Sequence, residues 1–307
     1  MSDALDAFLD TALAARKPNH AAARLGGPLI KRAFFDRTLQ GALVTKSNTS
    51  DLVTATDKAV EALVKAHILS VFPDHGFVGE ETFDALAPSA STQEYVWVID
   101  PVDGTTNFVH GFPFTCISIG LVKDGVSIVG VVLNPILNET YYAAKGTGAF
   151  LLDPEGVRHV LPLHGLKPWA GFEGSLVSTE YGYERDERLD SKLTSLTRIL
   201  KAPTRGIRSL GSAALEACYT ARGTFDLYWE AGVHMWDVAA SAVIIEEAGG
   251  AIANFVPFSQ NPDGSEFVDL KQRKFIFVRP IPGGREEAWK VVRQLRDHLE
   301  TLEYQRD

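Results

Sequence analysis

The sequence predicts an α/β (α+β) protein in which two patterns of secondary structure follow one another. Residues 57–72 carry apolar side chains at helical spacing, and residues 76–152 then form short apolar runs separated by turn signals. From residue 173 onward, strand-like runs alternate with helix-like stretches. Helices followed by an antiparallel sheet, and then alternating strands and helices, indicate a mixed fold with two lobes.

In the first half, helices are expected over residues 4–15 and 57–72, the second of which reads DKAVEALVKAHILSVF. The strand-like runs that follow are GFVG (76–79), YVWVID (95–100), FTCISIGLVKDGVSIVGVVLNP (114–135) and ETYYAAKGTGAFLL (139–152). A KDG turn within the third run predicts a hairpin. Residues 152–172 are rich in Pro, Gly and His, and are expected to be an exposed edge or a connection between lobes.

In the second half, strands are expected at GSLVS, TRGIRSL and TFDLYWEAG. Helices are expected at RDERLDSKLTSLTRILKA, GSAALEACYTARG, WDVAASAVIIEEAGG and REEAWKVVRQLRDHLETLEYQ. The predicted organisation is therefore an N-terminal α+β lobe over residues 1–151, a connecting segment over 152–172, and a C-terminal α/β lobe over 173–307.

Composition limits the classes of function. The net charge of −9 argues against a nucleic-acid partner, because such proteins need a basic surface to displace counterions from phosphates. No run reaches the roughly 20 apolar residues of a membrane span, and the acidic N-terminal stretch does not resemble a signal peptide. Cys116 and Cys218 show no metal or redox spacing. Cytoplasmic residence without a membrane or nucleic-acid partner is expected.

Acidic residues stand at the ends of several predicted elements. They are Asp57 in DLVTATD, Glu80 and Glu81 in FVGEET, Asp100 and Asp103 in VIDPVDGTTNF, and Asp237 in HMWDVAASAV. Taken singly, each is also explained as a turn former, strand end or helix cap. If they converge, carboxylates about 4 Å apart repel by roughly 4 kcal/mol per pair at an effective dielectric constant near 20. A divalent cation would relieve this repulsion.

The chemistry of these side chains favours a hard cation. The expected ligands are all oxygen atoms, which selects Mg²⁺ over Zn²⁺, and His234 is expected to pack nearby rather than to bind the metal. Next to Asp103, the turn GTTNF offers backbone amides and the hydroxyls of Thr105 and Thr106 to a phosphate group. Acids that bind Mg²⁺ beside amides that bind phosphate predict a site of phosphate ester hydrolysis.

These segments resemble the inositol monophosphatases, a family of lithium-sensitive, metal-dependent phosphatases. The matching segments are VTKSNTSDLVTATD, FVGEET, WVIDPVDGTTNFVHGFPF and GIRSLGSAALEACYTARGTFDLYWEAGVHMWDVAASAVIIEEAGG, in the order found in the family. The resemblance implies the layered αβαβα sandwich of sugar phosphatases, a homodimer, and a phosphoric monoester hydrolase. Its expected reaction is the hydrolysis of myo-inositol monophosphate, a phosphorylated polyol, with two or three Mg²⁺ ions.

The resemblance also implies roles for individual residues. Metal ligation falls to Glu80, Asp100, the Val102 carbonyl, Asp103 and Asp237. A metal-bound water would attack phosphorus in line, activated around Glu80 and the Thr105–Asp57 pair, while Asp237 would help to protonate the departing alkoxide. The substrate contacts are Glu80, Val102, Asp103, Gly104, Thr105, Gly211, Ser212, Ala213, Glu230 and Asp237. Lys46 would lie in a mobile loop near the metals.

Three alternatives remain open. A haloacid-dehalogenase phosphatase needs its two aspartates two residues apart, whereas Asp100 and Asp103 are three apart. A related monophosphatase could act mainly on another sugar phosphate, histidinol phosphate or a 3'-phosphonucleotide, although Glu230 suits a polyol and would repel a second phosphate. An inactive homologue could bind inositol phosphate as a regulator.

Overall fold

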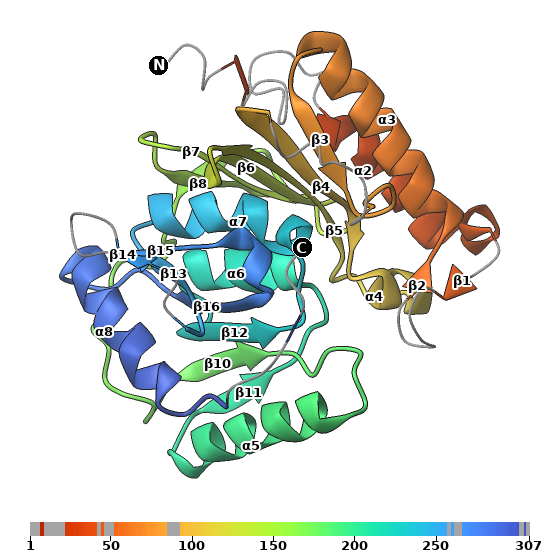
Figure 1. Ribbon diagram of the computed structural model, residues 1–307. Helices are drawn as coiled ribbons and strands as arrows, with labels where there is room; N and C mark the ends of the chain where they lie inside the picture. The colour runs from red at the N-terminus through yellow and green to blue at the C-terminus, as the bar shows by residue number, and fades with distance from the viewer. Residues whose placement is uncertain are drawn as a thin grey trace.

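The computed structural model has two main sheets and confirms the mixed α/β class. It describes residues 7–8, 22–41, 44–45, 52–84, 93–256, 259–260, 266–300 and 304. The first sheet has seven strands in the order β3-β4-β5-β6-β7-β8-β9, and the second has five in the order β11-β10-β12-β16-β13. Figure 1 shows these sheets stacked with layers of helices, which is the layered αβαβα arrangement.

The seven-stranded sheet is antiparallel except for β3, which runs parallel to β4. Its strands are β3 (Gly76–Gly79), β4 (Tyr95–Asp103), β5 (Cys116–Lys123), β6 (Val126–Asn134), β7 (Glu139–Ala144), β8 (Ala149–Leu152) and β9 (Arg158–Val160). The prediction that the strand beginning at Tyr95, β4, ends at Asp100 was wrong, because β4 continues to Asp103. A register shift lets the chain resume pairing with β5 at Asp103. Strand β9 lies within residues 152–172 and pairs with β8 at the edge of the sheet.

The five-stranded sheet carries the C-terminal half. Its strands are β10 (Leu176–Thr179), β11 (Gly206–Arg208), β12 (Leu227–Ala231), β13 (Ala251–Asn254) and β16 (Lys274–Val278). Strand β10 runs parallel to β11 and β12, whereas β16 is antiparallel to its two neighbours. Two small sheets pair β1 (Val44–Thr45) with β2 (Leu52–Val53) and β14 (Ser259–Gln260) with β15 (Glu266–Phe267).

Three hydrophobic cores lie between the layers. Helices α2 (Ala22–Phe35) and α3 (Ala55–Val71) cover the outer face of the seven-stranded sheet, and α6 (Ala213–Ala221) and α7 (Met235–Glu247) lie between the two sheets. Helices α5 (Glu187–Lys201) and α8 (Gly284–Arg296) cover the five-stranded sheet from outside. The remaining described helical segments are η1 (Arg37–Gln40), α4 (Thr105–His110) and η3 (Leu270–Gln272).

Two helix predictions need correction. The C-terminal helix ends at Arg296, whereas its charged pattern predicted a continuation to about residue 305. Helix α2 was not predicted at all, because its sequence AARLGGPLIKRAFF contains Gly26, Gly27 and Pro28. Most of the helix predicted over residues 4–15 lies outside the described residues, although residues 7 and 8 are helical.

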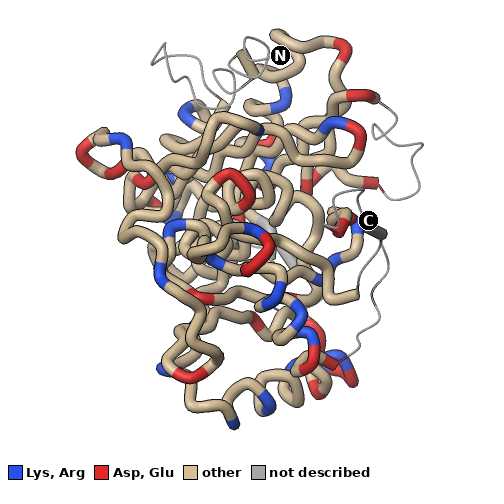
Figure 2. The backbone as a smooth tube through the Cα atoms, turned by 90° about the vertical axis from the view of Figure 1, so that its left-hand side faces the viewer, with Lys and Arg blue, Asp and Glu red and all other residues tan. Residues whose placement is uncertain are grey.

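Helix α7 lies unusually close to the seven-stranded sheet. Gly120 on β5 pairs with Gly130 on β6, and both face Ala239 or Ala240 of the helix. This approach lets α7 bring its first turn to the end of β4. Among the described helices, none is both long and apolar enough to cross a lipid bilayer. Acidic and basic residues are interspersed along the chain in Figure 2.

Candidate metal and substrate site

Three buried or half-buried aspartates from two elements meet at the end of β4. Asp100 and Asp103 flank the register shift in β4, and Asp237 stands in the first turn of α7. One carboxylate oxygen from each lies within 4.8 Å of the others. Val102, between Asp100 and Asp103, helps to orient the first of these carboxylates, because its N–H donates to Asp100 Oδ1 at 2.9 Å. The irregular strand therefore places two predicted ligands on one side of the sheet.

The carboxylates of this cluster act on one another electrostatically. Burial raises the pKa of Asp100 well above its usual value, and the charges of Glu80, Asp103 and Asp237 raise it further. The pKa of Asp237 is also raised well above its usual value, mainly by burial and then by the charges of Asp103 and Glu80. The charges that act most strongly on Asp100 are thus all negative. Such a set of carboxylates fits a hard divalent cation with oxygen ligands.

Asp103 also joins the two halves of the molecule. Its Oδ2 atom accepts hydrogen bonds from the Ser212 hydroxyl and from the Ala214 N–H, the second at 2.9 Å. The following residue, Gly104, has a φ of +81°, and a Cβ added there would lie 2.8 Å from the Gly211 carbonyl oxygen. Only glycine suits this turn, because both the backbone conformation and the close approach exclude a side chain.

Asp57 reaches the site from α3. Helix α3 is capped by Thr54 rather than by Asp57, which is the third helical residue and accepts the Thr54 N–H at 3.0 Å. The Thr105 hydroxyl lies 3.3 Å from Asp57 Oδ1 and 3.0 Å from the Val102 carbonyl oxygen, so the two acceptors share its proton. The pKa of Asp57 rises to about 6, mainly because of burial. The predicted Thr105–Asp57 pair is present in the fold.

A second carboxylate on the same face of α3 was missed by the sequence analysis. Glu61 is only 1 % exposed, and its Oε2 accepts the Glu81 N–H at 2.7 Å. A Cβ added at Gly79 would lie 2.4 Å from the Glu61 carboxyl carbon. Glu61 therefore holds the turn after β3 in which Glu80 stands. Its spacing of four residues from Asp57 was the signal that could have identified it.

Replacing Glu61 with Ala should raise the Mg²⁺ concentration that gives half-maximal activity by roughly 10-fold, because residues that support metal ligands typically contribute 10- to 100-fold to metal affinity. The measurement is a titration of phosphate release with Mg²⁺. Glu94 provides the control, since it is an exposed acid paired with Lys123 at 2.8 Å, and Glu94→Ala should leave the titration unchanged. An unaltered Mg²⁺ requirement in Glu61→Ala would show that the turn after β3 keeps its conformation without Glu61.

The predicted substrate residues of the C-terminal half form a wall beside the aspartates. Gly211, Ser212 and Ala213 follow β11 and begin α6, and Glu230 is a buried residue of β12. The Tyr228 hydroxyl donates to Glu230 Oε2. Burial, then the charge of Glu180, raises the pKa of Glu230 well above its usual value. This wall is joined to the cluster of aspartates through the hydrogen bond from the Ser212 hydroxyl to Asp103.

Two further side chains that hold this wall were not predicted. Asn107 of α4 donates from Nδ2 to the Leu210 carbonyl oxygen at 2.6 Å, and Glu180 accepts the Gly211 N–H at 2.7 Å. Both contacts join residues far apart in the sequence. His234 is packed as expected, with its ring stacked on Trp236 at 4.4 Å between centroids. Lys46 lies outside the described residues.

Comparison with known proteins identifies the family. A family model described as the inositol monophosphatase family matches residues 14–275. The chain belongs to the inositol monophosphatase family. A Solanum lycopersicum protein named inositol monophosphatase 2 is 39 % identical over 272 residues, which cover 88 % of this chain and 92 % of that protein. The solved structure of an inositol monophosphatase from Anabaena (Nostoc) sp. PCC 7120 has a TM-score of 0.71 and 28 % identity, and the match covers 98 % of this chain and 99 % of that chain.

Family membership establishes the class of reaction. This inositol monophosphatase family member is a phosphoric monoester hydrolase, and its acidic cluster is able to bind the metal on which the family depends. Another relative, from Neurospora crassa, is 36 % identical over 289 residues, covers 85 % of this chain and 83 % of that protein, and is named quinic acid degradation cluster protein x. Relatives at similar identity thus carry different names.

Proposed function

We propose that this phosphatase hydrolyses myo-inositol monophosphate to inositol and inorganic phosphate, by in-line attack of water on phosphorus. The observation that carries the proposal is the position of Glu230, a buried acid in the wall that Ser212 ties to Asp103. An acidic group beside the reacting centre suits the hydroxyl groups of a polyol, whereas it would repel a second phosphate group.

The metal would be held by residues of both halves. Asp100, Asp103 and Asp237 supply three carboxylates, and Glu80 and the Val102 carbonyl supply the remaining protein oxygens. Two or three Mg²⁺ ions bound there would offset the negative charge on the phosphoryl and leaving oxygens. The donor set fits this ion because it contains only hard oxygen ligands.

The remaining residues would orient the substrate and move protons. The amides of Gly104 and Thr105 would hold phosphate oxygens at the tight turn. The Thr105 hydroxyl would receive a hydrogen bond from the attacking water and pass a proton toward Asp57, whose Oδ1 lies 3.3 Å away, with Glu80 assisting. Asp237 would direct a proton toward the departing alkoxide. Ser212, Ala213, Gly211 and Glu230 would face the polyol.

The proposal is tested with a panel of phosphate monoesters, measured by phosphate release with Mg²⁺, with EDTA and with millimolar-range Li⁺. Inositol 1-phosphate should be the best substrate, and EDTA should abolish its hydrolysis. Suppression by Li⁺ is expected from the family resemblance. Activity that persists in EDTA would exclude the metal mechanism, and a trapped phospho-enzyme would favour the haloacid-dehalogenase mechanism instead.

Glu230→Gln should lower kcat/KM for inositol 1-phosphate by 10-fold or more and leave a small aryl phosphate nearly unaffected, because a hydrogen bond to a charged group contributes about 1.5–3 kcal/mol. Glu139→Gln is a matched control. Glu139 is likewise a strand residue that accepts from a tyrosine two residues away, Tyr141, at 3.0 Å, but it lies outside the substrate wall. Equal losses on both substrates would remove Glu230 from polyol recognition.

A second candidate is a monophosphatase whose main substrate is another sugar phosphate, histidinol phosphate or a 3'-phosphonucleotide. This candidate is kept because the Neurospora crassa relative, at similar identity, is not named as an inositol monophosphatase. The same panel separates the two, and the absence of turnover on every substrate together with inositol phosphate binding would indicate a regulator. The proposal also includes a homodimer, cytoplasmic residence and lobe boundaries at residues 151 and 173. Light scattering would test the homodimer.

A further inference from the structure

Tyr304 lies against the bend that leaves the substrate wall. Strand β12 carries Glu230, and the chain then turns at Gly232, whose φ is +107°, before α7 begins with Asp237 in its first turn. The Tyr304 hydroxyl lies 3.4 Å from the Ala231 carbonyl oxygen. A Cβ added at Gly232 would be 3.2 Å from the same hydroxyl. Tyr304 therefore touches the bend that links Glu230 to Asp237 of the aspartate cluster.

Arg273 completes the contacts to this bend. Its guanidinium donates to the Gly232 carbonyl oxygen through Nη2 and to the Val233 carbonyl oxygen through Nε, the second at 3.3 Å. The Gly232 N–H donates in turn to the Arg273 carbonyl oxygen at 2.8 Å. The carbonyls of residues 231, 232 and 233 thus each accept a hydrogen bond from Tyr304 or Arg273.

Arg273 is the C-cap residue of η3 and has the left-handed backbone conformation common at helix ends. Arg273 has a φ of +59°, in the left-handed region that glycine adopts without strain and other residues rarely adopt. The guanidinium carbon lies 5.2 Å from the centroid of the Tyr304 ring, within the range of a cation–π interaction. The helix end accounts for this backbone conformation, and the conformation lets the guanidinium reach both the bend and the Tyr304 ring.

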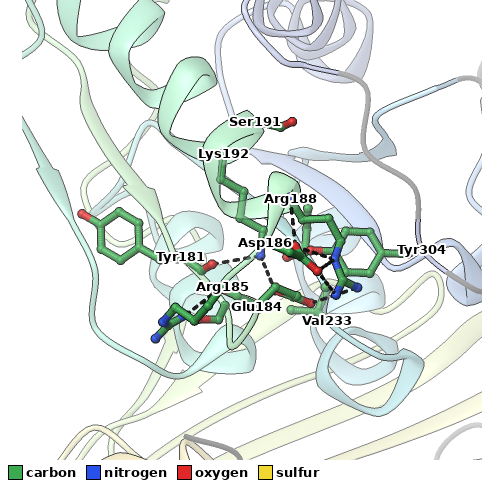
Figure 3. A network of polar contacts seen from close by, with 12 residues as sticks. Tyr181, Glu184, Arg185, Asp186, Arg188, Ser191, Lys192, Val233 and Tyr304 are labelled. Atoms are coloured by element: carbon green, nitrogen blue, oxygen red, sulfur yellow. Dashed lines mark hydrogen bonds and ion pairs between the residues drawn. The ribbon is translucent and has the colours of Figure 1, made fainter. Parts of the chain in front are cut away.

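Tyr304 also joins the bend to α5. The ring faces Arg188 at 5.3 Å and Lys192 at 5.7 Å, and Figure 3 shows these α5 side chains beside it. Lys192 is only 1 % exposed and donates from Nζ to Glu184 Oε2 at 2.8 Å and to the Tyr181 carbonyl oxygen at 2.9 Å. The ring is therefore held by three cations from two separate segments.

We propose that Tyr304 and Arg273 are positioning residues for polyol recognition, which hold the bend at residues 231–233 and so fix Glu230 relative to Asp237. In this proposal both residues act through the bend and not by contact with the substrate. The proposal rests on the proposed function, because it assigns them an effect through Glu230. Their loss should weaken the binding of the polyol part of the substrate and leave the chemistry at phosphorus intact.

The test compares Tyr304→Leu and Tyr304→Phe on inositol 1-phosphate and on a small aryl phosphate with saturating Mg²⁺. Tyr304→Leu should raise KM for inositol 1-phosphate about 5- to 10-fold, with kcat on both substrates within about 2-fold of the unmodified enzyme. Tyr304→Phe keeps the ring on the cations but loses the hydroxyl, so KM should rise only about 2- to 3-fold. Should Tyr304→Leu not fold, Tyr304→Phe decides, and an unchanged KM would overturn the proposal.

Two controls sharpen the test. Tyr95→Leu removes another half-buried tyrosine that lies under a cation, Lys123 at 4.9 Å, but in β4 of the other sheet, and KM should not change. In the Glu230→Gln background, Tyr304→Leu should add no further rise in KM, because both changes act on one contact. Additive effects, or equal losses on both substrates, would overturn the proposal. Failure of the proposed function is distinguishable, since the unmodified enzyme itself would then show no preference for inositol 1-phosphate.

Discussion

Replacing Asp100 with Asn is expected to lower metal-dependent phosphate release by about 10³-fold, comparable to the loss of a major electrostatic group in an active site. Asp100 is one of three aspartates whose oxygens lie within 4.8 Å of one another. The other two are Asp103 and Asp237, the latter in α7. Asn keeps an oxygen that can accept the Val102 N–H, so the local backbone should be preserved. What the variant loses is the negative charge that attracts the cation.

The same substitution should make the metal-free protein more stable. The pKa of Asp100 is raised in the folded state, so its ionised form is disfavoured there and the stability of the fold falls as pH rises through that raised value. Asn carries no such penalty. In EDTA at pH 7.5 the midpoint of thermal unfolding should rise by about 2–4 °C for each kcal/mol gained. Calorimetry of both proteins, with and without Mg²⁺, provides the measurement.

Asp153→Asn provides a control of opposite sign. The pKa of Asp153 is lowered by its hydrogen bond to His159, so its ionised form supports the fold, and the loss of this charge should not stabilise the protein. Activity should be unchanged, because Asp153 follows β8 and lies outside the site. A fall in unfolding temperature for Asp100→Asn, or retention of more than a tenth of the activity, would contradict the proposed role of the cluster.

The segments that carry the acidic cluster could be predicted from sequence because each combines a recognisable local pattern with chemistry. The VIDPVDGTTNF stretch has aspartates three residues apart and a glycine with a positive φ, and Asp237 starts a helix rich in small residues. Their convergence was a hypothesis from the shared position of these acids at strand ends and helix starts, whereas their individual ligand roles came from the family resemblance. The geometry adds the physical reason, which is that a register shift in β4 and the close approach of α7 bring Asp100 and Asp237 together.

The residues that were missed act through contacts between distant parts of the chain. Glu61 contacts the turn after β3, twenty residues away, and only its spacing from Asp57 signals it in the sequence. Asn107 contacts residue 210, more than one hundred residues away, and Tyr304 contacts residue 231, 73 residues away, and no local pattern reveals either contact. Helix α2 was missed for a related reason. Its glycines are poor helix formers, yet a Cβ at Gly26 would lie 2.9 Å from both Ile117 and Val60, so tertiary packing explains them.

Gly130→Ala is expected to destabilise the fold by more than 3 kcal/mol, at or above the upper end for overpacked cores. Its added Cβ would lie 2.1 Å from the Ala240 carbonyl oxygen and 2.8 Å from the carbonyl carbon. Both are backbone atoms of α7, so no side chain can rotate away. Helix α7 must move off the sheet instead, and with it Asp237. Urea unfolding should therefore show a lower midpoint, and metal-dependent activity should fall as well.

Gly27→Ala is a control that shows whether any glycine-to-alanine substitution in a packed region destabilises the fold, or only one that clashes with the backbone of α7. Its added Cβ would lie 2.8 Å from Cδ2 of Leu133, which is the far end of a flexible side chain. Alanine is favoured over glycine in helices by about 1 kcal/mol, although Pro28, which follows, reduces this gain because it disfavours helical backbone for a preceding residue with a Cβ. The unfolding midpoint should therefore fall much less than in Gly130→Ala. If both variants lost stability equally, the approach of α7 to the sheet could not be what fixes Asp237 beside Asp100, and the geometry of the metal cluster would need another explanation.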